Sequence, residues 1–290
     1  MVKKYIDLHS HTFYSDGCDD PKSLIRAAKL KGTDIFAITD HDTLDGYFRG
    51  IEEAKKWNIC LIPGVEVTTK HYHILGLNID PYNKDFANFL AHIRGLQEKV
   101  CQQRIEMAHA AGLPITLEKV IRAFPHSRIG KYNLLMTIIQ DPECIAYTEQ
   151  HYPGASPDDL FTSYFKKGGI AGSVEQRHYV RAKEAIDAIH AADGVAIVAH
   201  PFKQIKADIP RHLDSLVAKG IDGLEIQPNY GSANNPFRAY ALENSLLMSY
   251  GSDYHGPTVA RPLLGRGQEN GIDEEDFEKL LIRGRENSYA

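Results

Sequence analysis

The chain has 290 residues, 43% of them hydrophobic, which is enough to bury a large core in one domain or in a domain with an insertion. Its net charge of −5 disfavours a broad surface for long nucleic acid, and it contains no apolar stretch of about 20 residues that would span a membrane. The 14 histidines are unusually many and indicate metal binding.

The N-terminal residues and the cysteines predict a cytoplasmic protein. The sequence enters a strand pattern near Tyr5 without the apolar segment of a signal peptide. The cysteines are scattered and form no C-x-x-C pair, which is typical of reduced thiols in the cytosol.

Strand-like apolar runs alternate with helical patterns in the first eighty residues and again after residue 180. The predicted strands are Tyr5–Leu8, Asp34–Thr39, Cys60–Ile62 continuing to Val67, His73–Leu77, Val195–Ala199, Gly223–Ile226 and Leu247–Tyr250. The predicted helices are Pro21–Leu30, Thr43–Lys56, Ala182–Ala192, Ile209–Lys219, Pro236–Asn244 and Asp273–Ile282. This alternation predicts an α/β fold with a mainly parallel sheet or barrel. Seven strands, one fewer than in the usual eight-fold barrel, predict a distorted or incomplete seven-stranded (β/α) barrel.

The middle of the chain lacks this alternation and is helical throughout. Its predicted helices are Phe86–Cys101 running on to His109, Leu117–Ala123, Gly130–Ile139 and Pro157–Phe165. We therefore expect a barrel domain made of residues 1–82 and 173–290. Residues 83–172 would form a helical insertion that acts as a lid over the C-terminal face of the barrel.

Possible metal ligands lie at the ends of several predicted strands. His9 and His11 are two residues apart, so both project to the same side of an extended segment. Asp16 follows in a glycine-containing turn. The second strand ends in Asp40, His41 and Asp42. We predict His41 as a ligand and its two aspartate neighbours as acceptors that orient imidazoles.

The remaining strand ends add further ligand types. Glu66 follows Gly64-Val65 and is suited to bridge two metal ions, while His73 begins the next strand and is favoured over His71, which falls in the preceding turn. His200, Asp253 and His255 close two later apolar runs. Because chance rarely places such residues at so many strand ends, the set predicts a metal centre.

The motifs D-L-H-x-H-T-x-x-S-D-G, T-D-H-D, G-V-E, H-x-L-G, A-H-P and S-D-x-H, spread from Asp7 to about Gly256, resemble the PHP (polymerase and histidinol phosphatase) family. The resemblance is to the bacterial branch with a helical insertion that acts on nucleotides or short RNA. It implies two to three divalent ions, of which His9, His11, Glu66 and Asp253 would hold the first; Glu66, His73 and His200 the second; and Asp16, His41 and His255 the third. Mixed nitrogen and oxygen ligands suit manganese, iron or zinc.

The resemblance also implies a place for substrate recognition. Family members have a G-R-x-H run near Gly130, where this chain has Lys131 for the arginine and Asn133 for the histidine. Arg128 lies close by in the sequence, and Lys203 follows Phe202 where Gly-Arg is often found. We predict these four residues, Arg128, Lys131, Asn133 and Lys203, as substrate contacts.

The resemblance implies a phosphoesterase that uses a water bridging two metal ions as its nucleophile. The expected substrate is a small phosphorylated molecule, either a nucleotide 5′-monophosphate or 3′,5′-bisphosphate or a short oligonucleotide. Histidinol phosphate is an alternative substrate. Amidohydrolase barrels also begin with H-x-H, but Glu66 and the Asp253–His255 pair fit the PHP pattern better. A non-catalytic regulatory PHP module is a further alternative.

Overall fold

The computed structural model describes residues 4–127, 129–172, 174, 179–226, 235–256 and 278–279. The chain divides into two compact units, one formed by Met1–Ala91 with Val180–Ala290 and the other by His92–Tyr179. They are called below the sheet unit and the helical unit, and each is described by itself. The role of the helical segment as a lid stays a prediction.

Seven strands form one sheet in which spatial order follows chain order. They are β1 (Ile6–Asp7), β2 (Ile35–Ile38), β3 (Cys60–Thr68), β4 (His73–Leu77), β5 (Val195–Val198), β6 (Gly223–Glu225) and β7 (Leu247–Ser249). The predicted α/β class and the number of strands are confirmed. Each predicted strand overlaps one of the observed strands.

Strand direction decides which ends of the strands meet. The pairs β1–β2, β2–β3, β5–β6 and β6–β7 are parallel, whereas β4 runs antiparallel to both of its neighbours, β3 and β5. The first residue of β4 therefore lies at the sheet edge where the parallel strands end. His73 pairs with Thr68, the last residue of β3.

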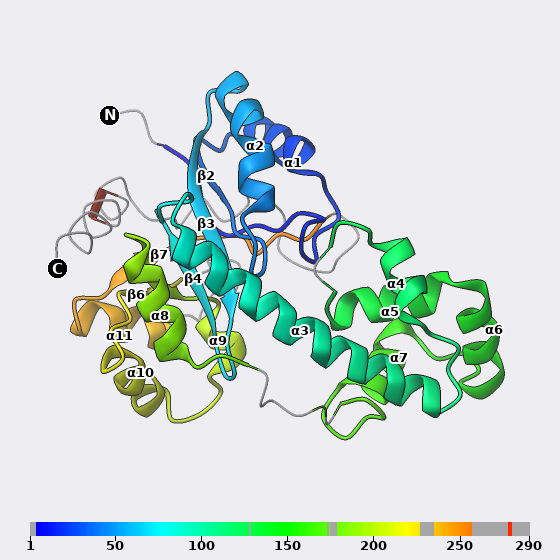
Figure 1. The fold of residues 1–290 in the computed structure, drawn as a ribbon. Coiled ribbons are helices and arrows are strands. Elements are labelled where there is room, and N and C mark those ends of the chain that lie inside the picture. Colours follow the sequence, from blue (N-terminus) through cyan, green and yellow to red (C-terminus); the bar gives the residue numbers. More distant parts are fainter. Residues whose placement is uncertain are drawn as a thin grey trace. The chain divides into compact units, whose positions relative to one another are not determined.

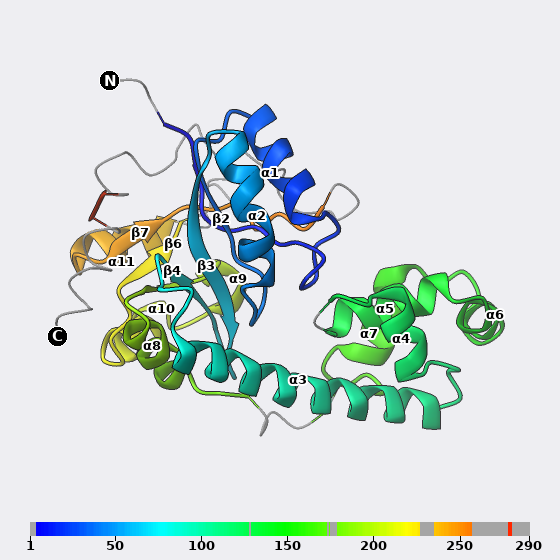
Figure 2. The same cartoon turned by 45° about the horizontal axis from the view of Figure 1, so that its top comes forward.

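The sheet curls so that the segments that follow its two outer strands meet (Figures 1 and 2). The Leu8 amide donates a hydrogen bond to the Tyr250 carbonyl at 2.8 Å, and the Asp253 amide donates to the His9 carbonyl at 2.9 Å. A Cβ atom on Gly251 would lie 2.1 Å from the His9 Cβ. This close approach requires glycine at position 251.

Alternate residues of the strands fill two apolar layers. On β2, Ile35 and Ala37 join a cluster with residues of β1, β3, β4 and β5. Phe36 and Ile38 point the other way and pack against α1 (Pro21–Leu30) and α2 (Asp45–Lys56). This is the two-residue periodicity of a strand that is buried on both faces.

The other described helices of the sheet unit are α8 (Ala182–Ala191), α9 (Pro201–Gln204), α10 (Ile209–Val217) and α11 (Asn235–Glu243). Asp20 caps α1 as predicted, because its carboxylate accepts the amides of Lys22 and Ser23. The short helix α9 was not predicted from the sequence. The predicted helix Asp273–Ile282 lies outside the described residues except for positions 278–279.

The helical unit contains α4 (Leu117–Ala123), α5 (Lys131–Gln140), α6 (Pro142–His151) and α7 (Pro157–Phe165), and α3 (Lys84–Ala110) runs from the sheet unit into it. Leu134, Ile138, Tyr164 and Phe165 belong to its buried core. Helix α6 was missed from the sequence although it carries a clear start signal. Its cap Asp141 accepts two backbone amides and is followed by proline.

Two further findings concern the chain as a whole. No helix in the described part of the chain is long and apolar enough to cross a membrane. Cys18, Cys60, Cys101 and Cys144 are all reduced thiols, as the sequence predicts.

The close approach of Gly251 to His9, which accompanies the curl of the sheet, can be tested by substitution. Gly251→Ala should destabilise the protein by about 1–3 kcal/mol because the added methyl group overlaps His9. Gly95→Ala in α3 is the matched control, since no atom lies within 4 Å of its added Cβ, and it should be neutral or stabilise by up to about 1 kcal/mol. Denaturant unfolding measures both. Equal stability of Gly251→Ala and the wild type would contradict the close approach.

Candidate metal centre

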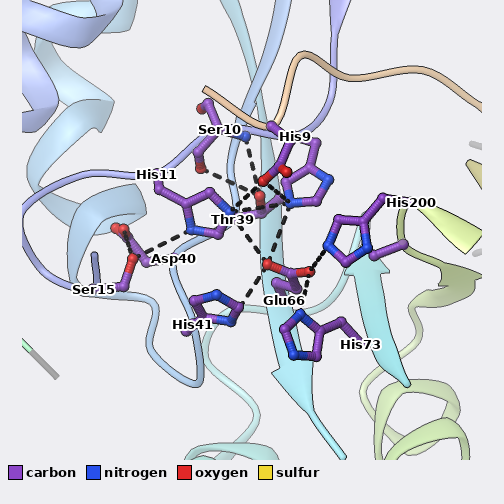
Figure 3. A network of polar contacts seen from close by, with 12 residues as sticks. His9, Ser10, His11, Ser15, Thr39, Asp40, His41, Glu66, His73 and His200 are labelled. Atoms are coloured by element: carbon purple, nitrogen blue, oxygen red, sulfur yellow. Dashed lines mark hydrogen bonds and ion pairs between the residues drawn. The ribbon is translucent and has the colours of Figure 1, made fainter. Parts of the chain in front are cut away.

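The nine side chains predicted as metal ligands come together at one edge of the curled sheet. They are His9, His11, Asp16, His41, Glu66, His73, His200, Asp253 and His255. Figure 3 labels six of them, with the carboxylate of Glu66 at the centre of the imidazoles of His9, His11, His41, His73 and His200. Most of them lie in the segments that follow β1, β2, β5 and β7. Glu66 lies within β3, and His73 is the first residue of β4.

Each oxygen of the Glu66 carboxylate faces its own set of imidazoles. Oε1 lies 3.0 Å from His73 Nδ1 and 2.9 Å from His200 Nε2. Oε2 lies 3.2 to 3.4 Å from three ring nitrogens, those of His11, His9 and His41. A carboxylate with different partners on its two oxygens has the arrangement of a bridging ligand.

Asp253 joins the same group from the segment after β7. Its Oδ1 lies 3.4 Å from Nε2 of both His9 and His11. The two Nε2 atoms are themselves only 3.1 Å apart. Two imidazoles and two carboxylates therefore direct one atom each at a common point, with all four donor atoms within 4.8 Å of one another.

Asp16 is the acidic member of a second group. Its Oδ1 lies 3.2 Å from His255 Nε2 and 3.5 Å from His11 Nδ1, and its Oδ2 lies 3.8 Å from His41 Nε2. His11 thus faces Asp16 through one ring nitrogen and Glu66 through the other. A third group of donors consists of His41, Glu66 and His73.

The cluster is buried, and its charges shift one another. Although burial raises the pKa of the three carboxyl groups, the surrounding imidazoles hold it well below the usual range in Asp16, Glu66 and Asp253. Burial lowers the pKa of His11, but the close carboxylates of Asp253 and Glu66 raise it to about 9. The three acids are therefore anionic at neutral pH.

The pKa values of three other buried imidazoles shift in different directions. Burial lowers the pKa of His41 and of His200, and the nearby acids only partly oppose it. Burial also lowers the pKa of His9, but the charges of Glu225, Glu66 and Asp253 raise it well above the usual range. His41 and His200 are thus neutral at pH 7, the form in which an imidazole binds a metal ion.

The residues present fit divalent cations. Glu66 Oε2 and Asp16 Oδ1 are buried, and neither has a hydrogen-bond partner in the described part of the chain. Buried carboxylate oxygens are normally paired, so these two oxygens indicate a cation between the converging side chains. A donor set of imidazole nitrogens and carboxylate oxygens is typical of sites for manganese, iron or zinc.

Three residues of this region have an unusual backbone conformation. His200, Asp253 and Asp42 have φ angles of 27°, 53° and 55°, in the left-handed region that residues other than glycine rarely adopt. Each follows a strand at the edge where the ligands gather. Such strain persists only where the surrounding structure enforces it, and it is common at functional sites.

Sequence reasoning missed the acidic residue that supports two of the histidines. Glu225 ends β6 and is fully buried; its Oε1 contacts His9 Nδ1 at 2.9 Å, and its Oε2 accepts the His200 amide at 2.6 Å. The signal was present, since Glu225 is a charged residue at the end of an apolar strand, as in the other motifs. Glu225 fixes the ring orientation of His9 and the backbone turn at His200.

The two aspartates predicted to orient imidazoles each bind a residue whose hydroxyl group lies beside an imidazole. Asp40 accepts the Ser15 hydroxyl at 2.7 Å, and Ser15 Oγ lies 3.3 Å from His11 Nδ1. Asp42 accepts the Thr68 amide at 2.7 Å, and Thr68 Oγ1 lies 3.4 Å from His41 Nδ1. Asp40 also accepts the amide and the hydroxyl of Thr12, so it holds the loop after His11.

The predicted substrate contacts are dispersed over the two units. The ammonium group of Lys203 pairs with Asp253 Oδ2 in the sheet unit. In the helical unit, Lys131 is the first residue of α5, while the buried Asn133 accepts the Gly130 amide at 2.8 Å and so caps that helix. Arg128 lies outside the described residues.

Comparison with known proteins gives three similar curated relatives. The 5′-3′ exoribonuclease Rnm of Escherichia coli K12 is 30% identical over 87% of this chain and 85% of its own. The phosphoribosyl 1,2-cyclic phosphate 1,2-diphosphodiesterase of Eggerthella lenta is 28% identical over 89% and 97% of the two chains. The 3′,5′-nucleoside bisphosphate phosphatase of Chromobacterium violaceum is 29% identical over 87% of each.

The family model for the PHP domain matches residues 7–228. A solved structure from Bifidobacterium adolescentis, described as that of a metal-dependent phosphoesterase, has a TM-score of 0.78 at 25% identity and covers 97% of this chain and 96% of its own. Together with the cluster of histidine and carboxylate side chains, these matches show that the chain belongs to the PHP-domain family and is a metal-dependent phosphoesterase, a hydrolase of phosphoric ester bonds.

Proposed function

We propose that the chain hydrolyses a phosphate ester of a nucleotide, either a 5′-monophosphate or a 3′,5′-bisphosphate, or of a short oligonucleotide. The observation that carries the proposal is the Glu66 carboxylate, whose two oxygens face separate imidazole sets within one buried cluster. The names of the relatives support a nucleotide, since two of them act on RNA or on a nucleoside bisphosphate.

The geometry supports three ion positions. His9, His11, Glu66 and Asp253 would hold the first ion, and Asp16, His41 and His255, joined by His11, would hold another. Glu66, His73 and His200 would hold the remaining ion, since both imidazoles contact Glu66 Oε1, and His41 lies close enough to contribute. Manganese, iron and zinc fit this mixture of nitrogen and oxygen donors.

The residues of the chain have separate tasks in the proposed reaction. When bound, the ions supply a hydroxide nucleophile at neutral pH and neutralise charge on the phosphoryl oxygens. Glu225, Ser15 and Thr68 contact the imidazoles of His9, His11 and His41 and limit their rotation. Lys203, paired with Asp253, places a positive charge beside the first ion position for a substrate oxygen.

Two alternatives remain to be separated by experiment. Histidinol phosphate would need the same hydrolytic chemistry and differs only in the group that carries the phosphate. A non-catalytic module would not require a complete ligand set, whereas all nine ligand positions are filled here. Hydrolysis of a nucleotide phosphate is therefore the better supported function.

Metal content tests the bridging role of Glu66. Glu66→Gln removes the charge shared by two ion positions, so the protein should lose at least one ion more than Asp16→Asn, which affects one position only. Glu52→Gln on α2 is the control, because its exposed side chain pairs with Lys55 on the same helix, and its metal content should equal that of the wild type. Elemental analysis of the purified proteins gives the ratios. Equal metal loss in Glu66→Gln and Asp16→Asn would contradict a bridging role.

A substrate panel tests the proposed activity itself. Metal-replete protein should hydrolyse nucleoside 5′-monophosphates, 3′,5′-bisphosphates or short 5′-phosphorylated RNA, with kcat/KM at least about tenfold above that for histidinol phosphate. Chelation should abolish turnover, and manganese, iron or zinc should restore it better than calcium. Glu66→Gln serves as the inactive control. Faster hydrolysis of histidinol phosphate, or no turnover of any member, would refute the nucleotide proposal.

A further inference from the structure

The helical unit contains a buried arginine that has no acidic partner among the residues that the structure describes. Arg104 on α3 is only 5% exposed, and its Nε has no hydrogen-bond partner among the described residues. Its one hydrogen bond in that part of the chain joins Nη2 to the Tyr179 hydroxyl at 3.5 Å, which is long for a hydrogen bond. A buried guanidinium without a carboxylate costs stability, so its presence indicates a ligand that supplies the missing negative charge.

A second cation lies near Arg104. Lys131 is the first residue of α5, and it forms no ion pair with a carboxylate in the described ranges. Burial, and then the positive charge of Arg104, lowers the pKa of its ammonium group. Two neighbouring cations that lack a counter-charge repel each other, and an anion between them removes that cost.

Uncharged side chains that can donate hydrogen bonds lie on the same face of α3 as Arg104. Gln97 is 3% exposed, and its buried Nε2 has no hydrogen-bond partner in the described part of the chain. Residues 97 and 104 are seven apart and so share one face of α3. Cys101 lies between them on that face, and its thiol donates to the Ile129 carbonyl at 2.9 Å, which brings the start of α5 beside this face.

The start of α5 adds its own partial positive charge. The helix has ten residues, and its first turn contains no acidic side chain. The amide groups at a helix N-terminus favour anions, and phosphate is a common occupant. A guanidinium, an ammonium, a side-chain amide and a helix N-terminus together match the several oxygens and the charge of a phosphate group.

We propose that Gln97, Arg104 and Lys131 form a phosphate-binding site in the helical unit, separate from the metal centre. The identification of its ligand as a non-reacting phosphate of a nucleotide substrate rests on the proposed function, whereas the site itself does not. Free inorganic phosphate offers the same chemistry and is the other possible source of the ligand.

Substrate discrimination tests the site in the metal-loaded protein. Arg104→Met should lower kcat/KM for a nucleoside 3′,5′-bisphosphate by about 10- to 100-fold, mostly through KM, since a hydrogen bond to a charged group is lost. The same nucleoside with only the reacting phosphate should change less than about threefold. Arg104→Lys should recover part of the loss. Lys99→Met, which removes an exposed charge from the same helix, should behave as the wild type.

Thermal unfolding tests the site without any nucleotide, so it remains informative if the proposed function fails. Without phosphate, Arg104→Met should unfold at a higher temperature than the wild type, because an unpaired buried charge is removed. Inorganic phosphate at constant ionic strength should raise the unfolding temperature of the wild type and of Lys99→Met more than that of Arg104→Met.

The outcomes separate the possible roles of Arg104. A loss specific to the bisphosphate supports a substrate phosphate as the ligand, whereas a loss only of the thermal response to inorganic phosphate supports free phosphate. A lower unfolding temperature of Arg104→Met without ligand, together with an undiminished response to phosphate, would show a purely structural arginine and overturn the proposal.

Discussion

The sheet unit is organised around the charged and titratable side chains that surround Glu66. One carboxylate lies among five imidazoles, and two further carboxylates, those of Asp16 and Asp253, face the same histidines. Titratable groups at this density are costly to bury unless they are paired or bind cations. The surrounding strands, turns and supporting acids are arranged so that this cluster forms at one place.

The sheet provides that place through the direction of its strands and its curl. Parallel strands deliver their C-terminal residues to one edge, and the reversed strand β4 delivers its first residue, His73, to the same edge. The hydrogen bonds between the segments after β1 and β7 bring His9 beside Asp253, although they are far apart in sequence. The apolar layers on both faces of β2 keep water from the base of the cluster and fix the strand positions.

A second layer of polar contacts limits the freedom of the ligand side chains. Glu225 holds His9 and the backbone of His200, while Gln204 contacts His200 Nδ1 at 3.0 Å and accepts the His73 amide. Side chains that are held in this way lose little entropy when an ion binds. The helical unit shows the opposite pattern, because Arg104 and Lys131 lack acidic partners in the part described. That difference separates a site built to hold cations from one suited to an anion.

The sequence by itself determined the reaction class and most of the elements. Apolar periodicity located all seven strands, and the strand-end motifs identified the side chains that gather around Glu66, because these signals are local. Only the tertiary structure decided which ligands share a position, since His11 contacts both Asp16 and Glu66 through its two ring nitrogens. It also revealed Glu225 and Arg104, whose importance depends on burial and on partners distant in the chain. A single sequence records residue types and spacing, whereas the charge balance at a buried atom depends on every segment packed around it.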